Sequence, residues 1–174
     1  MASLKSARSD KKTGNFDFSI DLPVRNEWKN VDLLRTSVQN CFIAVFSDVD
    51  GCHSLAMVTG ELVENAVKYG DWSGDERCFR LRVHGEERHA YVAVENPIRD
   101  GDQSVHRLLA TIERIQSYGN PEAAYRARLL ELASEAEDAG QSGLGLVRVA
   151  YEGRANLSAL VDNRTLKVVA EMTI

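Results

Sequence analysis

The sequence is poor in cysteine, in proline and in long apolar runs, and each shortage excludes a class of protein. It contains three cysteines and three prolines among 174 residues. The cysteines, Cys41, Cys52 and Cys78, are odd in number and lack C-x-x-C spacing, so neither a disulfide framework nor a zinc site is indicated. Reduced structural thiols are expected. No apolar run approaches the roughly 18 residues that a transmembrane helix needs.

Positive charge is also in short supply. The formal net charge is −5, which argues against binding to nucleic acid or to a membrane surface, because both demand an excess of Lys and Arg. The first 15 residues lack the apolar segment of a signal peptide, so we expect a cytoplasmic protein. These residues are polar and predict a disordered tail, either a solubilising segment or a basic arm for an acidic partner.

What the sequence does contain is regular hydrophobic periodicity from residue 16 onward, enough for one domain over 16–174. Alternation in FDFSIDL indicates a strand, while apolar spacings of three and four indicate helices. In chain order the pattern predicts a strand at 16–22, helices at 30–46 and 52–69, strands beginning at Cys78 and His89, two consecutive helices after Pro97, a glycine-rich loop with a helix ending near Gly153, and two closing strands.

This order of elements predicts an α+β fold. Two pairs of adjacent strands have links too short for parallel crossovers, so a doubly wound parallel sheet fits poorly. We expect a two-layer sandwich with a mixed, mostly antiparallel sheet and helices on one face.

The first candidate site is ELVENAVKYG, where Glu61 and Asn65 lie four residues apart on a predicted helix. Such residues point the same way, about 5–6 Å apart, so a carboxylate and an amide oxygen can converge on one ligand. Oxygen ligands of this kind suit magnesium, which usually keeps several waters and binds substrate phosphates as well. Glu61 is placed to orient or deprotonate a nucleophile. The alternative for this pair is a solvated helix edge.

The second candidate is SGLGLVRVAYEG, in which Gly143 and Gly145 precede a predicted helix. Glycines permit close approach, and a helix N-terminus offers unpaired N–H groups, which together suit a phosphate. It is not a P-loop, because G-x-x-x-x-G-K-[ST] is absent. The alternative is an ordinary tight entry into a helix. A third, weaker candidate is VAVENPIRDGD, where Asn96 at a strand end can read a base edge or cap a turn.

Together these stretches resemble the motif series of the GHKL ATPase superfamily, which includes histidine kinases, the ATP-binding part of DNA gyrase, Hsp90 and bacterial anti-sigma-factor serine kinases. The ELVxNAVKYG and SGLGL forms are most similar to the anti-sigma-factor kinases and related stand-alone switch kinases. The resemblance covers roughly residues 16–174 and implies the Bergerat-type ATPase fold. It also implies ATP and Mg²⁺ as cofactors, with a helical lid at about 98–142.

The resemblance assigns roles to matching positions. Asn65 would coordinate the magnesium and Glu61 would be the catalytic base. Gly143, Leu144 and Gly145 would line the phosphate end of the pocket, and Asn96 would meet the adenine. At this last position the family usually has D-x-G-x-G, whereas this chain has NPIRD. An Asn still offers an acceptor oxygen, and Asp100 and Asp102 are alternatives a few residues later.

The function that the resemblance implies is a serine/threonine protein kinase of anti-sigma-factor type in a partner-switching pathway. Its partner would be a protein, either an anti-sigma-factor antagonist-like domain or a sigma factor, and a homodimer is expected. The alternative is a degenerate module of the same fold that sequesters a partner without efficient ATP turnover. A third interpretation is an unrelated α+β domain whose motifs match by chance.

Overall fold

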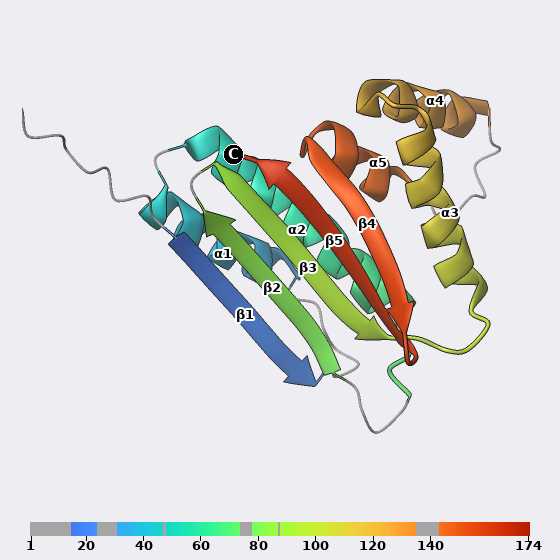
Figure 1. Cartoon of the computed structure of the whole chain (residues 1–174), viewed down its shortest axis with the longest axis horizontal. Coiled ribbons are helices and arrows are strands. Elements are labelled where there is room, and N and C mark those ends of the chain that lie inside the picture. Colours follow the sequence, from blue (N-terminus) through green and yellow to red (C-terminus); the bar gives the residue numbers. More distant parts are fainter. Residues whose placement is uncertain (1–14, 24–30, 47, 74–77, 87, 135–142) are drawn as a thin grey trace, which may run out of the picture.

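The fold was analysed in a computed structural model that describes residues 15–23, 31–46, 48–73, 78–86, 88–134 and 143–174. Figure 1 shows the elements in chain order, which are β1 (Asn15–Pro23), α1 (Val31–Val45), α2 (Val49–Tyr69), β2 (Cys78–Glu86), β3 (His89–Pro97), α3 (Gln103–Ser117), α4 (Pro121–Ser134), α5 (Leu144–Tyr151), β4 (Ala155–Asp162) and β5 (Thr165–Thr173). The predicted order of elements is therefore confirmed. The tail predicted over residues 1–15 lies outside the described residues, apart from Asn15.

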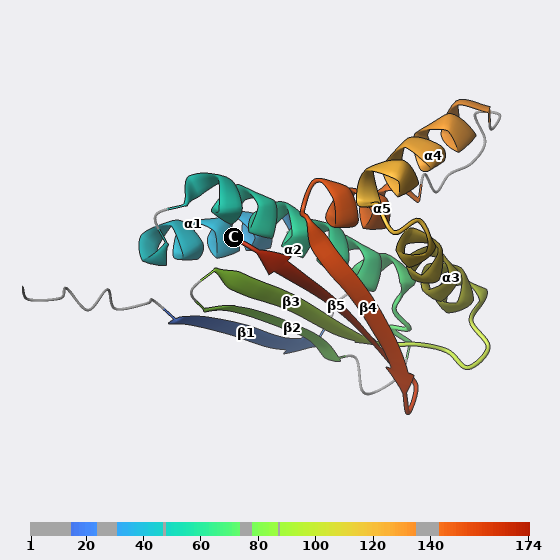
Figure 2. The same ribbon diagram turned by 45° about the horizontal axis from the view of Figure 1, so that its top comes forward.

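The five described strands form one sheet in the order β1-β2-β3-β5-β4. Every pairing between these described strands is antiparallel, so the sheet that they form is simpler than the mixed sheet expected. No parallel pair arises among them because β5 forms an antiparallel hairpin with β4 and pairs antiparallel with β3 on its other side. Figure 2 shows α1 and α2 stacked on one face of the sheet, which confirms the two-layer α+β fold.

The core lies between this face of the sheet and the long helix α2. Alternate residues of the central strands point toward the helices, as the two-residue period of a strand requires. On α2 the buried stripe has the three-and-four spacing of an amphipathic helix. The core residues with exposures of 0–2% in these elements include Leu55, Val58, Leu62, Val63, Phe79, Leu81, Val83, Val92, Val94 and Leu166.

The opposite face of the sheet carries charged side chains in a cross-strand row. The register places Asp21, Arg80, Glu95 and Lys167 side by side on four neighbouring strands. Arg80 lies 2.7 Å from Asp21 and 2.9 Å from Glu95, and Lys167 lies 3.1 Å from Glu95. The charged residues of this row alternate along each strand with mostly apolar residues, which point to the opposite face and pack against the helices.

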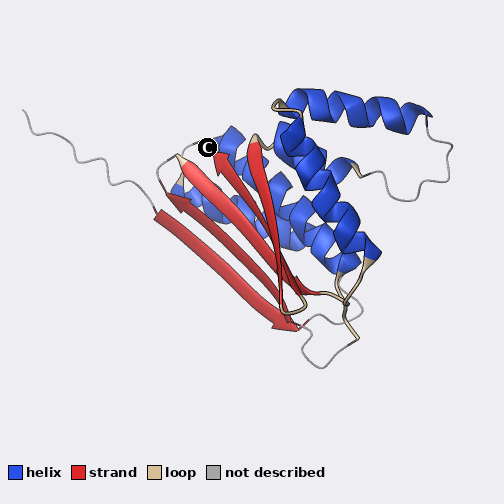
Figure 3. Cartoon of the chain, turned by 45° about the vertical axis from the view of Figure 1, so that its right-hand side comes forward, coloured by secondary structure: helices blue, strands red, loops and turns tan. Residues whose placement is uncertain are grey.

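The segment expected as one helical insertion at about 98–142 has two unlike parts. Helix α3 buries Val105, Leu108, Ile112 and Ile115 and is tied to β4 by a 2.8 Å hydrogen bond from Gln116 Nε2 to the Leu157 carbonyl. Helix α4 buries only Ala124, and Figure 3 shows it projecting from the body of the domain. The part of the prediction that falls on 135–142 lies outside the described residues.

Helix α2 begins at Val49, three residues earlier than the sequence pattern predicts, because Asp48 caps it. The Asp48 backbone is extended and its Oδ1 accepts a 3.0 Å hydrogen bond from the Gly51 N–H. The SDVDG segment, which the periodicity indicates as a break, is thus a cap followed by the first helical turn.

We expect Asp48→Ala to lower the free energy of unfolding by about 1 kcal/mol, because a free N–H at the start of α2 loses its acceptor. Asp48→Asn is the matched control, since an asparagine caps a helix about as well and should leave stability within about 0.5 kcal/mol of wild type. Urea denaturation followed by circular dichroism measures both. Equal losses in the two variants would show that the carboxylate acts by its charge rather than as a cap.

Within the described parts of the chain, no helix combines the length and the apolar character needed to cross a bilayer. The same parts hold no cluster of three or more His, Cys, Asp and Glu side chains arranged for a metal ion. Cys41 and Cys52 are free thiols. A metal bound by the described residues would depend on fewer than three such ligands, as magnesium sites commonly do.

Candidate functional site

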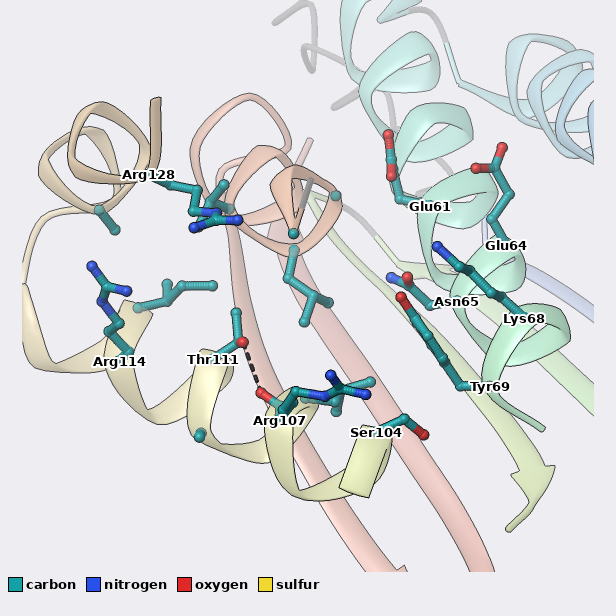
Figure 4. Close-up of a pocket in the computed structure, with 18 of the residues that line it drawn as sticks. Glu61, Glu64, Asn65, Lys68, Tyr69, Ser104, Arg107, Thr111, Arg114 and Arg128 are labelled. Atoms are coloured by element: carbon teal, nitrogen blue, oxygen red, sulfur yellow. Dashed lines mark hydrogen bonds between the residues drawn. The ribbon is translucent and has the colours of Figure 1, made fainter. Parts of the chain in front are cut away.

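Four of the residues singled out in the sequence line one cavity of about 920 Å³. Glu61 and Asn65 reach it from α2, and Gly143 and Gly145 reach it from the start of α5. Figure 4 shows the cavity between α2 on one side and α3 and α4 on the other, with Asn65 pointing into it. Leu144 is not among the lining residues and packs instead against the hydrophobic core.

Gly145 brings the start of α5 into direct contact with the polar pair on α2. A Cβ at this position would lie 2.5 Å from Glu61 Oε2 and 3.7 Å from Asn65 Nδ2. Gly143 precedes the helix with φ 59°, in the left-handed region that glycine adopts without strain. The two glycines therefore perform distinct tasks: one permits the turn and the other permits close packing beside Glu61.

Among the described buried side chains, Asn65 has the one nitrogen or oxygen atom that lacks a hydrogen-bond partner. Its Nδ2 is buried and has no hydrogen-bond partner. Such a group costs about 1–3 kcal/mol when nothing satisfies it, so it is typical of an atom that meets a ligand. The amide nitrogen suits a phosphate oxygen and the amide oxygen suits magnesium. The amide therefore fits the metal and phosphate chemistry expected from the sequence.

Glu61 forms an ion pair that the sequence did not indicate. Its Oε1 accepts a 2.7 Å hydrogen bond from Arg148 Nη1, contributed by α5 at a separation of 87 residues. Arg148 also contacts Glu152, with Nη2 lying 3.1 Å from Oε2. Burial raises the pKa of the Glu61 carboxyl, while the Arg148 guanidinium acts in the opposite direction. Glu61 is thus a carboxylate held in place at the rim of the cavity.

Four cationic side chains line the cavity, and sequence analysis missed them. Lys68 comes from α2, Arg107 and Arg114 from α3, and Arg128 from α4. The seven-residue spacing of Arg107 and Arg114 could have indicated that they share a helix face. Glu131 pairs with Arg114, and its Oε2 lies 3.1 Å from Arg128 Nη1. Arg107 and Lys68 have no ion pair with any other described residue.

Asn96 lies outside this cavity. Its side chain is 1% exposed, and its Nδ2 donates a 3.2 Å hydrogen bond to the Pro97 carbonyl. It borders a separate void of about 10 Å³ beside Leu108 and Leu166. Asp100 and Asp102, the alternatives to Asn96 for contacting the adenine, do not line the cavity either. Asp102 caps α3 by accepting from the Ser104 N–H at 2.8 Å, and Asp100 is 3.6 Å from Arg164.

Comparison with known proteins places the chain by fold alone. No protein-family profile matches the sequence, and no curated protein is significantly similar to it. Among solved structures, the chain is similar to one chain of the crystal structure of the SiaB–SiaC complex from Pseudomonas aeruginosa, with a TM-score of 0.62 and 17% sequence identity. The match covers 90% of this chain and 89% of that chain.

Proposed function

We propose that this chain is a regulatory protein kinase that binds ATP with magnesium and transfers the γ-phosphoryl group to a serine or threonine of a protein partner. The observation that supports this best is the orphaned Asn65 amide, which lies in the cavity beside Glu61 and Gly145. An unsatisfied amide, a carboxylate and a glycine-lined helix N-terminus form the set of groups that phosphoryl transfer uses for positioning and charge stabilisation.

The residues have separate tasks in this proposal. Asn65 holds the metal, which when bound supplies neutralisation of charge on the phosphate oxygens. Backbone N–H groups of Gly143, Leu144 and Gly145 orient the phosphates at the start of α5. Glu61 accepts the proton of the attacking hydroxyl, and Arg148 fixes the carboxylate on one side so that Oε2 stays available.

A protein partner is part of the proposal. The similar solved structure is a complex of two proteins, SiaB and SiaC. Together with the anti-sigma-factor kinase resemblance of the two motifs, it supports partner switching as the mode of action. The partner would be a small anti-sigma-factor antagonist-like domain or a sigma factor, and the kinase itself would act as a homodimer in the cytoplasm.

A second function is favoured by the position of Asn96. Its side chain is buried away from the cavity, and α3 packs into the core rather than standing clear of it. These features suit a binding module that sequesters a partner without efficient ATP turnover. The two functions differ in one measurable respect: a kinase transfers ³²P from ATP to the partner, and a sequestering module binds the partner with no transfer.

The test of the proposal is calorimetric titration of the protein with ATP in the presence of Mg²⁺. We expect Asn65→Ala to weaken binding by about tenfold to hundredfold, because it removes a contact to a charged ligand worth about 1.5–3 kcal/mol. Asn40→Ala, which alters an exposed residue of α1, is the control and should bind as wild type does. Absence of heat in the wild type would reject the proposal, while unchanged binding in Asn65→Ala would reject the role of Asn65.

A further inference from the structure

We propose that the cavity recognises the triphosphate group and not the base, so that nucleoside triphosphates bind irrespective of their base. This inference rests on the proposed function, because it specifies which part of the nucleotide the same cavity reads. It concerns the class of ligand rather than the chemistry of transfer. Three independent features of the described residues carry it.

The first feature is the separation of Asn96 from the cavity. The void that Asn96 borders is about 10 Å³, which is at the lower limit for one ordered water and far too small for a purine. Asn65 of α2, Leu108 of α3 and Leu146 of α5 line both the void and the cavity and lie between the two. These leucines are 7% and 8% exposed and belong to the hydrophobic core. On this side of the cavity a base therefore meets the two leucines and the Asn65 amide in place of the Asn96 amide.

The second feature is that most hydroxyl groups of the cavity already have local partners. Ser104 Oγ donates to Asp102 Oδ1 at 2.7 Å. Thr111 Oγ1 donates at 2.7 Å to the carbonyl four residues earlier, as Figure 4 shows. Tyr118 Oη, just after the end of α3, accepts from an arginine of that helix at 3.3 Å. Tyr69 adds a further hydroxyl from α2. Discrimination between bases requires several donors and acceptors aimed at their edges, and the described lining residues offer few hydroxyl groups for this purpose.

The third feature is the charge of the cavity. The described lining residues supply four cationic side chains and two carboxylates, Glu61 and Glu64. Glu131 pairs with Arg114 and Arg128, so Arg107 and Lys68 are the two lining cations without an ion pair to another described residue. This excess contrasts with the net charge of −5 for the whole chain. Figure 4 shows Arg107 and Lys68 reaching into the space between α3 and α2. Guanidinium groups match the geometry of phosphate oxygens, so the cavity concentrates its binding free energy on the phosphates.

The experiment is calorimetric titration of the full chain, in the presence of Mg²⁺, with ATP, with GTP and with inorganic tripolyphosphate. We expect the dissociation constants of ATP and GTP to agree within about threefold, and that of tripolyphosphate to lie within about tenfold of both. ATP binding more than about tenfold tighter than GTP would overturn the inference and leave the proposed function intact. Binding of none of the three would contradict both.

A variant separates phosphate recognition from base recognition. Arg107→Ala should weaken ATP, GTP and tripolyphosphate by the same factor, about tenfold, because it removes one charged contact to the phosphates. Arg82→Ala is the matched control, since Arg82 is exposed on the open face of the sheet and should leave all three affinities unchanged. A loss confined to ATP in Arg107→Ala would assign this side chain to the base and overturn the inference.

Discussion

Replacing Glu61 with glutamine is expected to slow γ-phosphoryl transfer by about 10²- to 10⁴-fold, the range that a positioned general base contributes. The substitution keeps the shape of the side chain. Its amide oxygen can still accept the hydrogen bond that Arg148 Nη1 now donates to Oε1 at 2.7 Å. The substitution removes the basic group and turns the ion pair with Arg148 into a hydrogen bond to a neutral amide. Because the proposal gives Glu61 no contact with the metal or the phosphates, affinity for ATP and Mg²⁺ should change by less than about threefold.

Single-turnover transfer of ³²P to a partner protein measures the rate, and calorimetry measures the affinity. Glu113→Gln is the matched control because Glu113 is exposed on α3 and does not line the cavity. An unchanged rate in Glu61→Gln would remove Glu61 from the catalytic role. An equal loss of rate and affinity would instead assign the carboxylate to binding.

Gly145→Ala is expected to reduce the same rate by about 10²-fold while the protein stays folded. The added Cβ would lie 2.5 Å from Glu61 Oε2. That oxygen is the end of a flexible side chain, so Glu61 moves and the backbone does not. Alanine also favours a helix over glycine by about 1 kcal/mol, which supports the first turn of α5. The defect therefore arises from a misplaced carboxylate.

Gly60→Ala provides the matched comparison for this variant. Its Cβ would meet only the Arg35 side chain, at 3.0 Å from Cδ, so the transfer rate should equal that of wild type. Thermal unfolding monitored by circular dichroism tests whether both variants remain folded. If Gly145→Ala unfolds at room temperature, or transfers phosphate at the wild-type rate, the close packing of Gly145 on Glu61 is not what the site requires.

Much of the fold could be predicted because hydrophobic periodicity encodes which face of each element is buried. The alternation in β5 and the stripe on α2 both reappear as buried residues. The sheet order could not be predicted, because strand pairing depends on contacts between segments far apart in the chain. The start of α2 differs from the prediction for another reason: Asp48 and Asp50 interrupt the apolar pattern, yet Asp48 is a cap.

The part of the candidate site that depends on residues close together in the sequence was predictable. Glu61 and Asn65 share a helix face because they are four residues apart, and the glycines precede a helix that the apolar pattern indicates. The ion pair from Arg148 to Glu61 spans 87 residues, so no local pattern contains it. The burial of Asn96 was equally hidden, because it depends on how α3 packs Leu108 beside it.

Helix α4 has a consequence for the dynamics of the domain. It buries one residue, and its attachments include a stack of Tyr125 on Tyr151 at 5.1 Å and the ion pair from Arg114 to Glu131. An element with so little burial opens locally at a fraction of the global unfolding free energy. Opening would withdraw Arg128 and release Arg114 from Glu131, so the population of the opened state sets how many cations the cavity presents at any moment.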